Sequence, residues 1–88
     1  MEIKVTVSFL PPKKIQKLNK DLRGKSYVPA VLSFSYFEPT EEGMLLGEVL
    51  ICKPEARKLA KKNKVTEEEQ INQLIVHGIK HILGVHED

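Results

Sequence analysis

Apolar and polar positions alternate strictly at the start of the chain. Every second residue from position 3 to position 9 is apolar, and the residues between them are polar or charged. A period of two is typical of a β-strand with one face buried and the other in water. We therefore predict a strand over residues 2–9, with a buried face formed by Ile3, Val5, Val7 and Phe9.

After this strand the apolar spacing lengthens to that of a helix. Proline is tolerated in the first helical turn, so Pro11-Pro12 can end the strand and open the helix. Ile15, Leu18 and Leu22 then recur at i, i+3 and i+7 as one narrow apolar stripe. Gly24 is a helix stop signal, so we predict a helix between this proline pair and Gly24.

Two further strands are predicted in the middle of the chain. Residues 30–37 are rich in β-branched and aromatic side chains, which suit a pleated surface. Residues 44–52 are apolar on both faces, so this strand should be the central one of its sheet. The acidic segment 38–43 contains proline and glycine and is predicted to be the turn between the two strands.

The last third of the chain predicts two helices. Pro54 opens the first, which should end near Asn63. Thr66 and Glu69 form a capping box that opens the second, and this helix should run to Leu83 and stop at Gly84. Its buried face is predicted from helical spacing to consist of Ile71, Leu74, Ile75, Ile79 and Ile82.

The element order β-α-β-β-α-α predicts an α+β fold, a small mixed sheet of about three strands packed with three helices. At 88 residues the chain is expected to form a single domain over residues 1–88. No apolar run approaches the roughly 18–20 residues of a membrane span, and the alternating N-terminus does not resemble a signal peptide. The single cysteine, Cys52, fits a reducing compartment, so a cytoplasmic location is expected.

Positive charge is concentrated in two segments. Twelve of the 14 Lys and Arg residues lie in residues 13–25 and 53–64, and each segment contains a single acid. The two segments therefore carry a net charge of +10 in a chain whose net charge is only +2. This distribution favours a polyanionic partner. The alternative is that two amphipathic helices merely expose lysine-rich faces to water.

All three histidines fall in the last twelve residues of the chain. His77 and His81 are spaced i, i+4 on the predicted helix, so their side chains point the same way, as in the H-x3-H helices of zinc hydrolases. Two imidazoles at that separation can share one tetrahedral cation. A chain reversal at Gly84 would bring His86 and Glu87 back toward the pair. The alternative is two surface histidines spaced by four residues.

Three ordered motifs resemble those of the YbeY endoribonuclease family, the bacterial rRNA maturation factors. HGIKHILG at residues 77–84 resembles the family signature H-G-x-x-H-x-x-G-x-D-H, and LNKDLRGK at residues 18–25 resembles L-N-x-x-Y-R-G-K. VLSF at residues 31–34 and LGEVLI at residues 46–51 resemble the V-L-S-F and L-G-D-I-x-I strands. The resemblance covers nearly the whole chain from Val5 onward.

The resemblance implies one Zn²⁺ ion per chain, with His77 and His81 as two of its ligands. The family's third histidine position is occupied here by Glu87, and its aspartate position by His86. The third ligand is therefore expected to be Glu87, with His86 as the alternative. Family members also have a strand and helix before this segment and a helix after it, so the chain resembles a minimal or truncated core.

The implied reaction is hydrolysis of a phosphodiester by a metal-bound water or hydroxide. Arg23 would stabilise charge on the phosphate, although it could simply interact with the helix dipole. Ser33 would face the cleft, or be a satisfied strand serine. Glu48 would orient a histidine ligand, or face solvent. A zinc peptidase is disfavoured because Gly78 occupies the position of the catalytic glutamate in H-E-x-x-H.

The implied partner is single-stranded RNA, namely rRNA of the small ribosomal subunit, in the cytoplasm and without a membrane. The predicted phosphate-binding residues are Lys13, Lys17, Lys20, Lys25, Arg57, Lys58 and Lys61. Tyr27 and Phe37 could stack on unpaired bases, or be core or strand-edge residues. Two alternatives to the nuclease remain: a catalytically weak or inactive RNA- or ribosome-binding homologue with a degenerate metal site, and a metal with a purely structural role.

Overall fold

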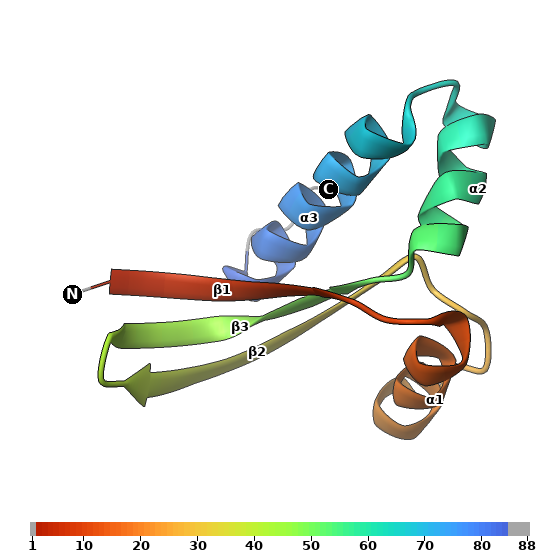
Figure 1. The fold of residues 1–88 in the computed structure, drawn as a ribbon. Coiled ribbons are helices and arrows are strands. Elements are labelled where there is room, and N and C mark those ends of the chain that lie inside the picture. Colours follow the sequence, from red (N-terminus) through yellow and green to blue (C-terminus); the bar gives the residue numbers. More distant parts are fainter. Residues whose placement is uncertain (1, 85–88) are drawn as a thin grey trace.

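The computed structural model describes residues 2–84, and its element order is the predicted one (Figure 1). The elements are β1 (Glu2–Phe9), α1 (Pro12–Arg23), β2 (Val31–Thr40), β3 (Gly43–Ile51), α2 (Lys53–Asn63) and α3 (Glu67–Ile82). The predicted α+β fold, with three strands and three helices, is confirmed. Within the described residues no helix is long and apolar enough to cross a membrane.

The three strands form one mixed sheet with the order β1-β3-β2. β1 runs parallel to β3, and β2 runs antiparallel to it. The prediction that β3 is central is therefore correct. Its second half is almost completely shielded from water, with Val49 and Ile51 at 0% exposure, because neighbours pair with both of its edges and helices cover both of its faces.

The helices cover opposite faces of the sheet (Figure 1). Side chains alternate along β3, so Val49 and Ile51 point to one face and Leu50 to the other. The Val49 face packs against α2 and α3 in a core cluster that includes Leu74 and Ile82. The Leu50 face packs against α1 in a second cluster, formed by Ile15, Leu32, Leu50 and Cys52.

The ends of α3 follow local signals in the sequence. The Glu69 N–H donates to Thr66 Oγ1 at 3.1 Å, which confirms the predicted N-cap. Of the predicted buried face, Leu74 and Ile82 are buried, while Ile71, Ile75 and Ile79 are partly buried against the same cluster. This helix is thereby held along the sheet with one face inward.

The prediction of a turn over residues 38–43 is wrong in its extent. β2 continues to Thr40, and its last residues pair with the start of β3. The pairing shifts register between Ser35 and Glu38, where Phe37 has a φ of 44°. Pro39 does not end the strand because β2 lies at the edge of the sheet, where a missing backbone N–H breaks no ladder hydrogen bond.

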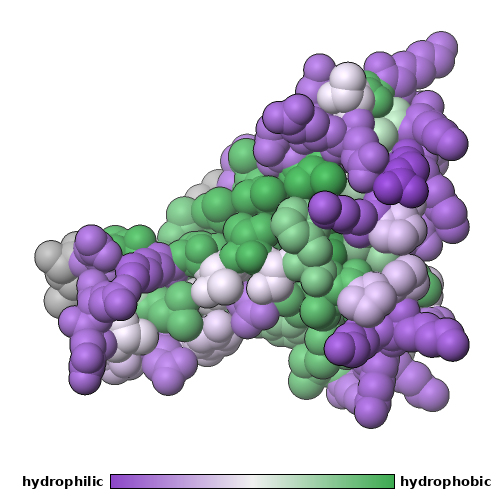
Figure 2. Space-filling model, in the orientation of Figure 1, coloured by the Kyte–Doolittle hydropathy of each residue, from purple (hydrophilic) through white to green (hydrophobic). Residues whose placement is uncertain are grey.

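Two predicted buried faces are only partly covered. In β1, Ile3 is 69% exposed and Phe9 49%, because this edge strand extends beyond the cover of the helices. In α1, Leu22 is 61% exposed, whereas Asn19 is 1% exposed. α1 docks through Ile15 and Asn19, which are spaced i, i+4, and Leu22 lies one turn further along the same face, at the exposed C-terminal end of the helix. Figure 2 shows apolar side chains gathered along the middle of the molecule and polar ones over α1 and α2.

Candidate metal centre

His77 and His81 lie on successive turns of α3, and their rings meet edge to face, with the Nε2 atoms close together. The two Nε2 atoms are 3.0 Å apart, and the ring centroids are 4.5 Å apart at an interplanar angle of 69°. Two nitrogens bound to one tetrahedral zinc at about 2.0–2.1 Å would lie about 3.3 Å apart. A small side-chain rotation covers this difference, so the pair fits two of the ligand positions of a zinc ion.

Within residues 2–84 the histidine pair has no third ligand beside it. No third Cys, His, Asp or Glu among residues 2–84 completes a metal-binding group with them. Both predicted third ligands, Glu87 and His86, lie outside the described residues. The zinc ion and its third ligand therefore stay predictions.

The histidines border a hollow of about 140 Å³ between α1, β2 and α3. Its lining consists of Arg23, Tyr27, Val31, Leu32, Ser33, His77 and His81. The residues come from three elements and from the loop that joins α1 to β2. The structure thus brings together four of the predicted site residues, namely the histidine pair, Arg23 and Ser33.

Arg23 is held at the edge of this hollow by β2. One guanidinium N–H donates to the Ser33 carbonyl at 2.6 Å, and the Arg23 Cζ atom lies 5.7 Å from the centre of the Phe34 ring. A guanidinium has five N–H donors, so one bond to a carbonyl leaves others to reach an anion. Arg23 also borders a neighbouring hollow, together with Leu22, Lys25 and Phe34.

Gly78 determines how closely the histidine helix approaches the sheet. A Cβ atom at this position would lie 2.8 Å from Ser33 Oγ and 2.9 Å from a methyl group of Val49. Such distances are far shorter than ordinary van der Waals contacts, so only glycine allows this packing. Sequence reasoning used Gly78 only to disfavour a peptidase and missed this role. A signal was present, because Gly78 is spaced i, i+4 between the buried residues Leu74 and Ile82.

Glu48 lies on the other side of the sheet from the histidines. Val49 points toward α3 at Gly78, and successive strand residues point to opposite faces. Instead, the Tyr36 hydroxyl donates to Glu48 Oε2 at 3.4 Å. Partial burial raises the pKa of Tyr36, and the negative charge of Glu48 raises it further. The structure therefore gives Glu48 a contact with Tyr36 and none with the histidine pair.

The predicted phosphate-binding residues fall into two groups. On α2, Arg57 is paired with Glu67 at 3.3 Å and Lys58 with Glu55 at 3.5 Å. Lys61 on α2 and the predicted lysines around α1 are exposed and form no ion pair with a carboxylate among residues 2–84. The lysines around α1 are Lys13, Lys17, Lys20 and Lys25. The lysines around α1 thus keep more of their charge available to a polyanion.

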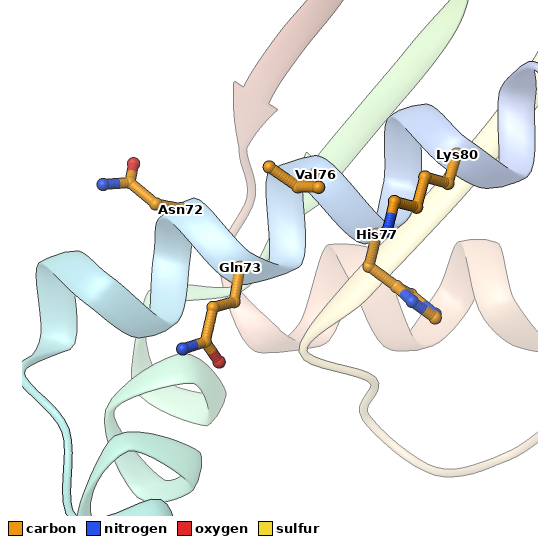
Figure 3. A pocket seen from close by; sticks show the side chains of 5 residues that line it. All are labelled: Asn72, Gln73, Val76, His77 and Lys80. Carbon is orange, nitrogen blue, oxygen red and sulfur yellow. The ribbon is translucent and has the colours of Figure 1, made fainter. Parts of the chain in front are cut away.

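A broader hollow of about 350 Å³ lies on the outer side of α3 (Figure 3). Its lining comes from this one helix: Asn72, Gln73, Val76, His77 and Lys80. His77 borders both hollows, whereas His81 borders only the inner one of the two. A ligand at the histidine pair can therefore be approached along α3 as well as from β2.

Comparison with known proteins gives consistent matches. The chain is 34% identical to the endoribonuclease YbeY of Bdellovibrio bacteriovorus over 91% of this chain and 51% of that protein. It is 36% identical to the endoribonuclease YbeY of Alkaliphilus metalliredigens, over 94% of this chain and 57% of that protein. It is 34% identical to the endoribonuclease YbeY of Alkaliphilus oremlandii, over 100% of this chain and 61% of that protein. The chain thus spans between half and two thirds of the length of these relatives.

The fold matches a solved structure as well. The solution structure of TM1509 from Thermotoga maritima superposes with a TM-score of 0.64 at 25% identity, over 99% of this chain and 54% of that one. The family model described as endoribonuclease YbeY matches residues 1–88. Since this match extends over the whole sequence, the chain belongs to the YbeY endoribonuclease family.

Proposed function

We propose that the chain forms the core of a metal-dependent endoribonuclease that cuts single-stranded RNA during rRNA maturation. The observation that carries this proposal is the histidine pair, whose Nε2 atoms converge to 3.0 Å beside Arg23 at one hollow. The names of the relatives support a nuclease. The exposed lysines around α1 support a polyanionic substrate, for which we propose rRNA of the small ribosomal subunit in the cytoplasm.

The histidine pair, Arg23 and Ser33 each have a distinct task in this proposal. His77 and His81 hold Zn²⁺ together with Glu87, or with His86 in its place. A zinc ion bound there supplies a Lewis acid and lowers the pKa of water. Arg23 binds the phosphate and stabilises the charge that develops on its oxygens. Ser33 positions Arg23 through its carbonyl oxygen, because that oxygen accepts the guanidinium hydrogen bond.

Metal analysis tests the first part of this proposal. Protein that contains residues 1–88, purified without a histidine tag, should contain close to one zinc ion per chain. His77→Ala and His81→Ala should each lose the metal, because two remaining ligands bind zinc weakly. Asn72→Ala, an exposed change on the same helix, is the matched control and should retain it. A wild type that is stable and free of zinc would contradict the proposal.

A second candidate function follows from position 87. The family pattern has histidine there and this chain has Glu87, so the chain could be an RNA-binding homologue whose metal site has lost hydrolysis. Cleavage of a single-stranded RNA by wild type and by Glu87→His separates the two. Activity in wild type supports the nuclease. Activity only in Glu87→His, and not in the control Glu41→His, supports the binding homologue.

A further inference from the structure

Tyr27 is an exposed aromatic side chain at the rim of the histidine hollow. It lies in the loop between α1 and β2, and 61% of its surface is exposed. It borders the same hollow as His77, His81 and Arg23. The proposed nuclease site makes no use of it.

The loop holds the backbone of Tyr27 in place. The side-chain amide of Asn19, a residue only 1% exposed, donates to the Tyr27 carbonyl at 3.0 Å. Gln16 Nε2 donates to the preceding carbonyl, that of Ser26, at 2.8 Å. On the far side of Tyr27, the Cys52 N–H donates to the Ala30 carbonyl at 2.9 Å. Both ends of the loop are thus anchored to packed elements, while the Tyr27 side chain remains largely exposed at the hollow.

The groups around the Tyr27 ring match the two parts of a nucleotide, its base and its phosphate. The Tyr27 hydroxyl has no hydrogen-bond partner among residues 2–84, so the ring is not held there by a polar contact. A guanidinium that can bind phosphate, that of Arg23, borders the same hollow. Nucleobases stack on exposed aromatic rings, and a fixed backbone lowers the entropy cost of presenting the ring.

We propose that Tyr27 is a base-stacking residue, which holds the nucleobase next to the phosphate bound at Arg23 and the histidine pair. This inference rests on the proposed function, because it takes single-stranded RNA as the substrate. It singles out Tyr27 among the exposed aromatic residues. Phe9 lies on β1, at the opposite edge of the sheet from β2, and Phe37 lies at the bulge of β2.

Fluorescence provides a direct test. The chain has two tyrosines and no tryptophan, so Tyr27 is the only such fluorophore in the variant Tyr36→Phe. Titration with a single-stranded oligouridylate of about six nucleotides should quench its emission, because the base stacks on the ring. An oligomer of equal length and charge that lacks the bases should bind with little quenching. A purely structural role of Tyr27 would not produce this difference.

Affinity provides the second readout. Tyr27→Leu should raise the Kd for the oligouridylate by roughly 5- to 100-fold, since it removes the π-face. The Kd for the oligomer without bases should change little. Tyr27→Phe, which keeps the ring, should restore most of the base-dependent affinity. Phe9→Leu is the matched control, an exposed aromatic at the opposite edge of the sheet, and should bind like wild type.

The outcomes separate this inference from the function on which it rests. If wild type cuts RNA, but the emission is not quenched and Tyr27→Leu binds as tightly, the stacking role is overturned and the nuclease proposal stands. If wild type neither binds nor cuts single-stranded RNA, both are overturned. Circular dichroism of Tyr27→Leu should match wild type, because the ring is exposed in the folded protein.

Discussion

At the scale of single residues, the histidine pair shows how far local geometry reaches. Residues spaced i, i+4 lie above one another on a helix, so the convergence of His77 and His81 follows from the helix alone. The residues that lie across the hollow from the histidines cannot be predicted from the helix. Arg23 and Ser33 come from two other elements. The hydrogen bond from the Arg23 guanidinium to the Ser33 carbonyl places the guanidinium at the hollow.

Glu48 and Tyr36 show the reverse case, in which the partner of a residue depends on the sheet. A carboxylate in a strand resembling L-G-D is a reasonable candidate for orienting a histidine. Its actual contact is the Tyr36 hydroxyl, because register and alternation turn it to the other face. The role predicted for Glu48 thus depended on a direction that only strand pairing sets.

The Tyr36 contact predicts a pH dependence of stability. The pKa of this phenol is raised from 10.0 by burial and then by Glu48, so the folded chain keeps a proton that the unfolded chain loses as the pH rises. Folding stability should therefore fall as the pH rises above about 10. Tyr36→Phe should lose less stability between about pH 9 and pH 11, as measured by urea unfolding. Parallel loss in the two proteins, which share all their lysines, would contradict this.

At the scale of elements, the site depends on how α3 lies on β2 and β3. The sequence predicts an amphipathic helix and its buried face, which the core cluster around Leu74 and Ile82 confirms. Hydrophobic spacing does not predict how close the helix comes. Gly78 sets that distance, because its missing side chain leaves room for Ser33 and Val49.

Gly78→Ala should therefore destabilise the fold, even though alanine is the better helix former by about 1 kcal/mol. Crowding against Ser33 and Val49 should lower the free energy of unfolding by about 1–3 kcal/mol. Zinc content should fall as well, since α3 and its histidines would move away from the sheet. Gln73→Ala, an exposed change on the same helix, is the control for chemical denaturation and metal analysis. Equal or higher stability of Gly78→Ala would show that the contact can relax.

At the scale of the whole molecule, charge and hydrophobic surface are separated. Figure 2 shows polar side chains over α1 and α2, and apolar ones along the sheet between them. Lys13, Lys17 and Lys20 share one face of α1, opposite the buried Ile15, and Arg23 lies at the end of this helix. In the proposed function, this face of α1 would bind a single-stranded polyanion, and Arg23 at the end of the helix borders the hollow.

Salt dependence tests this surface. The triple variant Lys13→Ala, Lys17→Ala, Lys20→Ala should weaken binding of the oligouridylate at low salt. It should also reduce the slope of log affinity against log salt by about 2, since each lost phosphate contact on a single strand contributes about 0.7. Lys4→Ala removes a lysine that is paired with Glu42 on the hairpin and should leave the slope unchanged. An unchanged slope in the triple variant would exclude this face of α1 from RNA binding.

The sequence by itself determined the order and type of the six elements, the central place of β3 and the facing histidines. These properties depend on periodicity, caps and helix geometry, all of which act between residues close in sequence. Only the tertiary structure decided the length of β2 to Thr40, the exposure of Leu22 and the direction of Glu48. Each of these depends on strand register, on edge position or on which face a neighbouring element covers. The contact at Gly78 and the hollow beside Arg23 also depend on distances between elements, which no local pattern of residues encodes.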